Sequence, residues 1–192
     1  DLVWRHLLSS IGDTKPGDGA PDVWPVTVPA ALVDEGRRAL GAAGWDIATP
    51  LLMVHPGAGG AAKRWPPAGF AAALAAVRRQ ATVDVVIHQG PADAAAVVAL
   101  RSQLTTPVLT LVEPSLPALA GALRCVRGLV GNDSGVSHLA AAVAAPSLVL
   151  CTPPMLPWRP WSPRARVVTV STTALATRDV EAVTRELRSL LR

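Results

Sequence analysis

From residue 30 onward, short apolar runs alternate with longer segments in which apolar residues recur every three or four positions. The short runs are typical of strands buried on both faces, and the longer period is typical of amphipathic helices. In segment 67–80, for example, Phe70, Leu74 and Val77 share one helical face. The pattern predicts strands at 51–55, 83–88, 107–112, 128–131, 147–151 and 166–170, and helices at 30–43, 67–80, 92–104, 116–123, 135–144 and 177–191.

This alternation favours an α/β fold with a parallel, Rossmann-like sheet flanked by helices, because parallel strands need crossover connections. Residues 30–192 are expected to form this domain. Residues 1–29 are rich in Pro, Gly and Asp and show no period, so we expect a linker that follows another element. In such sheets, ligands bind where strands end and helices begin, and the loops at those points are the candidates for chemistry.

Composition narrows the class of protein. Half of the 192 residues are hydrophobic, which argues against disorder. The net charge of +4 comes from scattered side chains, so nucleic acid is a poor default partner, and a phosphate-bearing small molecule suits this charge balance equally well. Residues 134–158 carry no Lys, Arg, Asp or Glu, but a histidine and several prolines interrupt them. A buried helix and strand therefore explain this stretch better than a membrane span does.

The cysteines and histidines predict neither a disulfide nor a metal site. Cys125 and Cys151 lie in apolar segments and are expected to be free core thiols in a reducing compartment. No CxxC motif is present, and His55, His88 and His138 are widely separated along the chain. We therefore expect no metal and no cofactor.

The first candidate loop has the sequence HPGAGGAAKRWPP and occupies residues 55–67. Gly57 and Gly59 allow the backbone to approach a ligand closely, and Lys63 brings a mobile positive charge suited to phosphate. The spacing does not match a Walker loop. The alternative is a flexible glycine loop with a solvated Lys–Arg pair. Trp65 is expected to be a packing anchor.

The second candidate loop, GNDSGVSH at residues 131–138, runs into an Ala-rich helix. Ser134 and Gly135 lie at its N-terminus, where free amides and the helix dipole attract anions. His138 lies one turn further along and can donate to a phosphate oxygen. Asp133 is expected to orient a sugar hydroxyl, because phosphate would repel it. The alternative is plain helix capping with His138 partly buried.

Three further loops carry weaker signals. Asp93 is placed to accept hydrogen bonds from a ribose diol or to cap a helix. Glu113, Ser115 and Leu116 form a region whose backbone can meet a nucleobase, although Ser115 also suits an N-cap. The loop at 152–161 is rich in Pro and Trp and either walls the site or packs.

Together, the segments HPGAGGAAKRWP, HQGPAD, GNDSGVSHLAAAVAAPSLVL and PWRPWSP resemble the heptosyltransferase-like glycosyltransferases of family 9 over residues 30–170. The resemblance implies one half of a GT-B fold, the half that binds a nucleotide-sugar. It implies that Lys63 contacts the diphosphate or the leaving oxygen and has the catalytic role. Asp133 would contact the donor sugar, and Ser134, Gly135 and His138 would bind phosphate. Asp93 lies near the family's ribose-binding acid, which is usually a Glu.

The resemblance also implies inverting, metal-independent transfer, with ADP-heptose as the favoured donor and a lipopolysaccharide-type or other glycan or glycolipid as acceptor. The acceptor and the catalytic base belong to an N-terminal domain that is absent here, so this chain alone is expected to be inactive. The expected location is the cytoplasm, at the inner face of the membrane if the full-length protein associates with it peripherally. The alternatives are a GT-B enzyme with another donor such as a UDP-sugar, a non-catalytic nucleotide- or phosphosugar-binding module, and a purely structural Rossmann-like domain.

Overall fold

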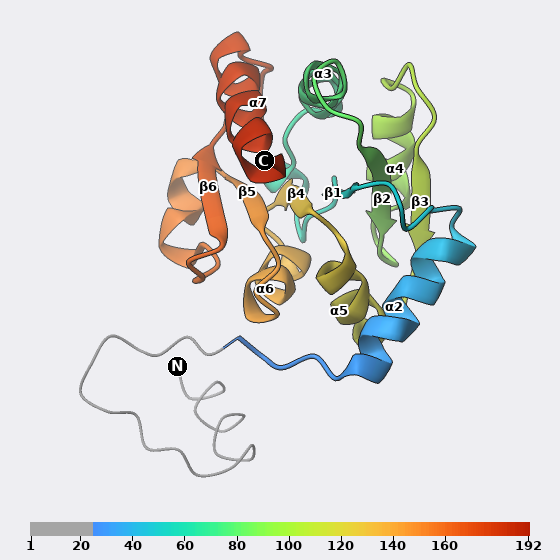
Figure 1. Cartoon of the computed structure of the whole chain (residues 1–192). Coiled ribbons are helices and arrows are strands. Elements are labelled where there is room, and N and C mark those ends of the chain that lie inside the picture. The colour runs from blue at the N-terminus through green and yellow to red at the C-terminus, as the bar shows by residue number, and fades with distance from the viewer. Residues whose placement is uncertain (1–24) are drawn as a thin grey trace, which may run out of the picture.

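The computed structural model describes residues 25–192, and in it six parallel strands form one sheet at the centre of the domain (Figure 1). The order across the sheet is β3-β2-β1-β4-β5-β6. The strands are β1 (Leu51–His55), β2 (Asp84–Gln89), β3 (Leu109–Val112), β4 (Gly128–Asn132), β5 (Ser147–Cys151) and β6 (Ala165–Thr169). The predicted Rossmann-like α/β fold is therefore confirmed.

The predicted helices are also present, with ends that differ by at most three residues. They are α2 (Ala30–Ala42), α3 (Pro67–Arg78), α4 (Ala94–Arg101), α5 (Leu116–Cys125), α6 (Gly135–Ala142) and α7 (Thr177–Leu191). Two 3₁₀ helices, η1 (Ala61–Lys63) and η2 (Pro153–Trp158), were not predicted. Such helices are too short to show a hydrophobic period, so sequence pattern does not detect them.

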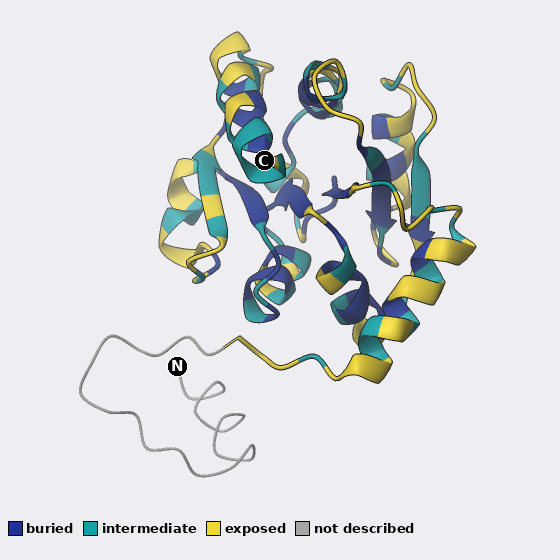
Figure 2. Cartoon of the chain, viewed as in Figure 1, coloured by how far each residue is buried: buried dark blue, intermediate teal, exposed yellow. Residues whose placement is uncertain are grey.

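Alternate residues of the inner strands β1, β2 and β4 enter two separate cores, one on each face of the sheet. Leu52 and Val54 of β1 pack in the core that α3, α4 and α7 cover. Leu51 and Met53 pack in the core under α2, α5 and α6. Figure 2 shows the result as a buried sheet between helices whose outer faces are exposed. This two-sided burial explains why the strands are continuous apolar runs.

The chain reverses its direction across the sheet between β1 and β4. These two strands are neighbours, with His55 opposite Gly131, but the chain leaves β1 toward β2 on one side and leaves β4 toward β5 on the other. The loops that follow β1 and β4 therefore lead to helices on opposite faces of the sheet, α3 and α6. In open α/β sheets, this switch point is where ligands bind.

Of the predicted linker 1–29, residues 1–24 lie outside the described residues. Residues 25–29 lack helix and strand, and the Val26 amide donates to the Ala142 carbonyl at 2.7 Å. None of the helices described is long and apolar enough to cross a membrane.

Candidate functional site

Lys63 and His138, which belong to different loops, meet at the same carboxylate. Lys63 Nζ lies 2.8 Å from Oδ2 of Asp133, and His138 Nε2 lies 3.6 Å from Oδ1 of the same residue. The Asp133 side chain is only 5% exposed, whereas those of Lys63 and His138 are 38% and 49% exposed. Two accessible cationic or donor groups thus surround a buried anion at the end of β1 and β4.

Asn132, the last residue of β4, holds the first loop against the second. It is completely buried. Its Nδ2 donates to the Pro56 carbonyl at 2.8 Å, and its Oδ1 accepts from the Trp65 amide at 3.0 Å. One side chain thereby fixes both ends of the glycine loop. Spacing along the sequence does not reveal this role, because the partners of Asn132 lie 67 or more positions away.

Two further contacts restrain the loop around Lys63. Trp65 is 1% exposed and packs edge-on against Phe70 with ring centroids 5.1 Å apart, which confirms the predicted packing anchor. Thr172, in the loop that follows β6, donates from Oγ1 to the Ala62 carbonyl at 2.8 Å. The backbone on both sides of Lys63 is therefore tied to the body of the domain, while its ammonium group stays accessible.

The N-terminus of α6 differs in part from the expectation. The Ser134 amide is occupied, because it donates to Ser137 Oγ at 3.1 Å. The next amides, of Gly135 and Val136, lie in the first helical turn, where no intrahelical acceptor exists. A Cβ added to Gly135 would have no atom within 4 Å, so this end of the helix opens on space. The amides offered to an anion are thus those of Gly135 and Val136 rather than that of Ser134.

The Asp93 carboxylate faces inward instead of toward an open loop. Its side chain is 12% exposed, and its Oδ2 accepts from the Gly90 amide at 2.9 Å. A Cβ at Gly57 would lie 2.0 Å from Asp93 Oδ1, so Gly57 serves to admit this carboxylate as well as to approach a ligand. Asp93 precedes α4 but its side chain makes no cap hydrogen bond. The expected capping role is therefore not observed, and the contact with a ribose diol stays a prediction.

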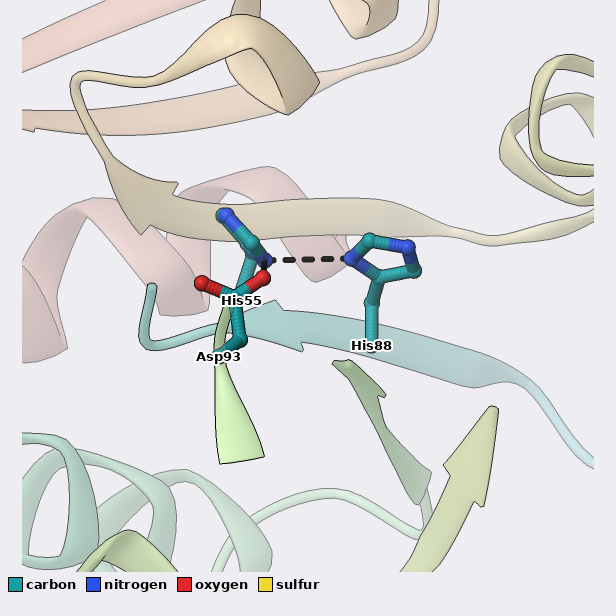
Figure 3. A group of neighbouring side chains, drawn as sticks. All are labelled: His55, His88 and Asp93. Atoms are coloured by element: carbon teal, nitrogen blue, oxygen red, sulfur yellow. Dashed lines mark hydrogen bonds and ion pairs between the residues drawn. The ribbon is translucent and has the colours of Figure 1, made fainter. Parts of the chain in front are cut away.

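Next to Asp93, two histidines that are distant in the sequence face each other (Figure 3). His55 ends β1, His88 lies in β2, and their Nδ1 atoms are 3.1 Å apart. His55 Nδ1 also lies 4.0 Å from Asp93 Oδ2. Burial lowers the pKa of His55, although the negative charge of Asp93 opposes this effect. Burial, followed by the neighbouring His55, lowers the pKa of His88 to about 4. The two histidines are 33 positions apart, so the sequence did not predict that they are neighbours. The pairing of β1 with β2 brings them together.

The expected nucleobase region follows β3. Ser115 caps α5, since its Oγ accepts from the Ala118 amide at 3.2 Å, as its alternative interpretation predicted. Glu113 adopts a positive φ of 44°, and Leu116 is 67% exposed. No contact in this region tests the nucleobase prediction.

The Pro/Trp loop at 152–161 and the two cysteines make none of the contacts described above. Trp158 and Trp161 are 70% and 54% exposed, so the Pro/Trp loop does not use them as core anchors. Cys125 and Cys151 are both free thiols, as predicted. Burial raises the pKa of Cys151 to about 11, with a smaller contribution from the charge of Asp133.

Solved structures with the same fold include E. coli ADP-heptose lipopolysaccharide heptosyltransferase II, with a TM-score of 0.73 and 25% identity over 90% of this chain and 55% of that one. A glycosyltransferase family 9 protein from Veillonella parvula matches with a TM-score of 0.74 and 21% identity, over 97% of this chain and 58% of that one. E. coli heptosyltransferase WaaC with ADP matches with a TM-score of 0.63 and 19% identity, over 81% of this chain and 48% of that one. The chain thus spans about half the length of these proteins.

No curated protein matches the sequence. The model of glycosyltransferase family 9 (heptosyltransferase) matches residues 23–187, which include every strand and the loops that carry Lys63, Asp133 and His138. This match extends over most of the chain, and the similarity in fold to the solved structures agrees with it. The chain therefore belongs to glycosyltransferase family 9.

Proposed function

We propose that this chain is the donor-binding half of a glycosyltransferase and that it holds the diphosphate of a nucleotide-sugar between Lys63 and the N-terminus of α6. The observation that supports this most directly is the convergence of Lys63 and His138 on Asp133 at the β1/β4 switch point. A positive side chain, a ring nitrogen and two free amides are suited to a compact dianion.

Asp133 explains how Lys63 is kept in place before the donor arrives. Lys63 carries three N–H donors, and the 2.8 Å contact with Asp133 uses one of them. The other two remain for phosphate oxygens. The Asp133 carboxylate is an acceptor only, so its role toward the donor would be to accept from a sugar hydroxyl while it orients the ammonium group.

The chemical role is stabilisation of the leaving group. Negative charge accumulates on the nucleoside diphosphate as the bond to the sugar breaks, and Lys63 with the Gly135 and Val136 amides would offset that charge. Preorganised donors of this kind are each worth about 3–4 kcal/mol. The phosphates then need no metal ion, in keeping with the inverting, metal-independent transfer that the sequence led us to expect.

For the donor we favour an ADP-sugar such as ADP-heptose, and for the acceptor a lipopolysaccharide-type glycan. Two of the structural relatives support the choice of donor, since one is described with ADP and another as an ADP-heptose heptosyltransferase. The acceptor and the catalytic base would lie on a partner half outside this chain. The isolated chain is therefore expected to bind the donor without transferring its sugar.

Thermal unfolding of the chain with ADP, UDP, GDP and CMP in parallel tests the proposal. ADP at about one hundred times its Kd should raise the free energy of unfolding by about 2.7 kcal/mol. Lys63→Ala should abolish most of this shift, whereas Arg185→Ala, which removes an exposed charge from α7, should leave it intact. No shift with any nucleotide would refute donor binding, and a larger shift with UDP would change the donor class.

A further inference from the structure

We propose that His55, His88 and Asp93 form a binding site for one divalent transition-metal ion of the Zn²⁺ class, separate from the diphosphate site. One candidate ligand atom from each residue lies within 4.8 Å of those from the other two. The three residues are 3%, 4% and 8% exposed. This inference does not depend on the identity of the donor.

The positions of the ligand atoms are close to those that a metal requires. Zn²⁺ binds imidazole nitrogen at about 2.0–2.1 Å, so two ligands of a tetrahedral site lie about 3.3 Å apart. The two Nδ1 atoms are 3.1 Å apart, close to this value. Asp93 Oδ2 is 4.0 Å from His55 Nδ1, and the three ligand atoms lie within 4.8 Å of one another, so the carboxylate has to move toward both histidines when an ion binds. Figure 3 shows the carboxylate beside His55 and the two rings facing each other through nitrogen.

The chemistry of the three groups also favours a cation. Two imidazole nitrogens and one carboxylate oxygen form a ligand set that suits Zn²⁺ and its neighbours in the first transition row. Buried carboxylates are usually paired with a positive charge or coordinate a metal. Near Asp93, however, the described contacts are one backbone amide at 2.9 Å and a histidine at 4.0 Å. Within the described residues, Arg64 acts on His55 through its charge but makes no hydrogen bond or ion pair with the Asp93 carboxylate, so a divalent ion would supply a positive charge in direct contact with it.

In the structure, the contact between the two Nδ1 atoms requires that one of them carries the proton and the other accepts it. A metal would replace this hydrogen bond. Both rings would then carry their proton on Nε2 and direct the Nδ1 lone pair at the ion, which changes the tautomer of one ring and leaves both neutral.

The backbone around the cluster is built to hold these side chains. His55 ends β1, His88 lies in the neighbouring β2, and Asp93 follows the turn after β2. Gly57 leaves space for the carboxylate, because a Cβ there would lie 2.0 Å from Asp93 Oδ1. The ion would therefore join two strand ends and fix the start of the glycine loop that carries Lys63. Its role would be structural, because it is held away from the diphosphate by different side chains.

Metal binding to the chain without a polyhistidine tag provides the test. The protein is treated with EDTA, exchanged into metal-free buffer and titrated with Zn²⁺ by equilibrium dialysis, with the metal content measured by mass spectrometry. We expect about one Zn²⁺ per chain. Titration with Co²⁺ should produce the visible absorption bands of a low-coordinate site with nitrogen ligands.

Three variants separate this site from adventitious binding. His88→Gln and Asp93→Asn should each weaken Zn²⁺ binding at least about tenfold, because even indirect partners of metal ligands contribute about 10–100-fold. His138→Gln is the matched control and should bind Zn²⁺ like the parent. Asp93→Asn retains an oxygen that can accept from the Gly90 amide, so it keeps the test valid if His88→Gln fails to fold. Circular dichroism checks the fold of each variant.

The proposal is overturned if the folded parent binds no Zn²⁺. It is also overturned if Asp93→Asn and His88→Gln bind the ion as tightly as the parent, or if only His138→Gln loses it. In these cases the two histidines form a metal-free hydrogen-bonded pair. Because nucleotide binding is measured with other ligands and with Lys63→Ala, failure here leaves the proposed function untouched.

Discussion

Two polar clusters occupy the carboxyl ends of the central strands, and they are built in opposite ways. Lys63, Asp133 and His138 form an accessible cluster, in which the side chains of Lys63 and His138 are 38% and 49% exposed. His55, His88 and Asp93 form an enclosed cluster in which every residue is less than a tenth exposed. The first has free donors for an anion, and the second has a carboxylate and ring nitrogens suited to a cation.

The difference has a physical origin in the elements that carry each cluster. Lys63 ends a 3₁₀ helix, and His138 lies on the exposed first turn of α6, so both extend into solvent. His55 and His88 lie on adjacent inner strands, where the sheet and the Gly57 loop cover them. Changes to the accessible cluster should therefore act mainly on ligand binding, and changes to the enclosed cluster mainly on stability.

Under the proposed function, the largest effect is expected from Lys63→Ala in a two-domain enzyme that includes this chain. Loss of one preorganised donor should lower kcat by about 10²–10³-fold, or about 3–4 kcal/mol. The free energy of unfolding should change by only about 1 kcal/mol, because the Lys63–Asp133 pair is partly solvated. Steady-state kinetics and urea denaturation measure the two effects.

Arg185→Ala is the control for this experiment, since Arg185 is an exposed basic residue of α7. Normal turnover in Lys63→Ala would remove the proposed role of the ammonium group. A stability loss as large as the loss in turnover would mean that the two clusters do not divide their roles as described.

A second effect, of similar size, concerns acid and the enclosed cluster in metal-free protein. The pKa of His88 is lowered from 6.5 to about 4, so between these values the unfolded chain binds more protons than the folded one. The contribution of His88 to the free energy of unfolding should be fully present above pH 6.5. It should fall by about 1.4 kcal/mol per pH unit toward pH 4, a loss of about 3 kcal/mol in all. Denaturation in EDTA across this range measures the slope.

His88→Gln should flatten this dependence, and His138→Gln should preserve it. An equal flattening in His138→Gln would show that the exposed histidine, rather than the buried pair, is responsible for acid sensitivity.

Gly57→Ala should destabilise the domain by about 1–3 kcal/mol, the usual range for an overpacked site. The added Cβ would lie 2.0 Å from Asp93 Oδ1 and displace the carboxylate from the Gly90 amide. Gly59→Ala is the matched control, because a Cβ there has no atom within 4 Å. Urea denaturation compares the two variants, and equal stabilities would contradict the packing of Asp93 against Gly57.

The smallest effect concerns Cys151, which ends β5 near the accessible cluster. Its pKa is raised to about 11 by burial, so very little thiolate is present at pH 8. In the folded chain, Cys151 should react with a disulfide reagent much more slowly than it does in denaturant, as mass spectrometry of the labelled peptides can show. Rapid labelling at pH 8 without unfolding would mean that this strand end opens to solvent.

The sequence was sufficient to predict most of the fold and part of the site. Continuous apolar runs such as 147–151 identify strands covered on both faces, and the spacing of Phe70, Leu74 and Val77 identifies α3, so the layers of the domain were predictable. The loops of Lys63 and His138 were predictable as neighbours, since both follow strands of a parallel sheet. Residue type was enough to mark both loops as candidates, because the features of the proposed phosphate site are local: glycines, a lysine and a helix N-terminus.

Tertiary structure alone decided which distant side chains meet in the interior. Asn132 joins both ends of the first loop, and the Ser134 amide is taken by Ser137. The pairing of β1 with β2 brings His55 to His88, 33 positions away, and Asp93 turns inward beside them. A short local pattern reports which face of a helix or strand is buried, but contacts between buried side chains depend on strand order and register, which the whole chain sets together.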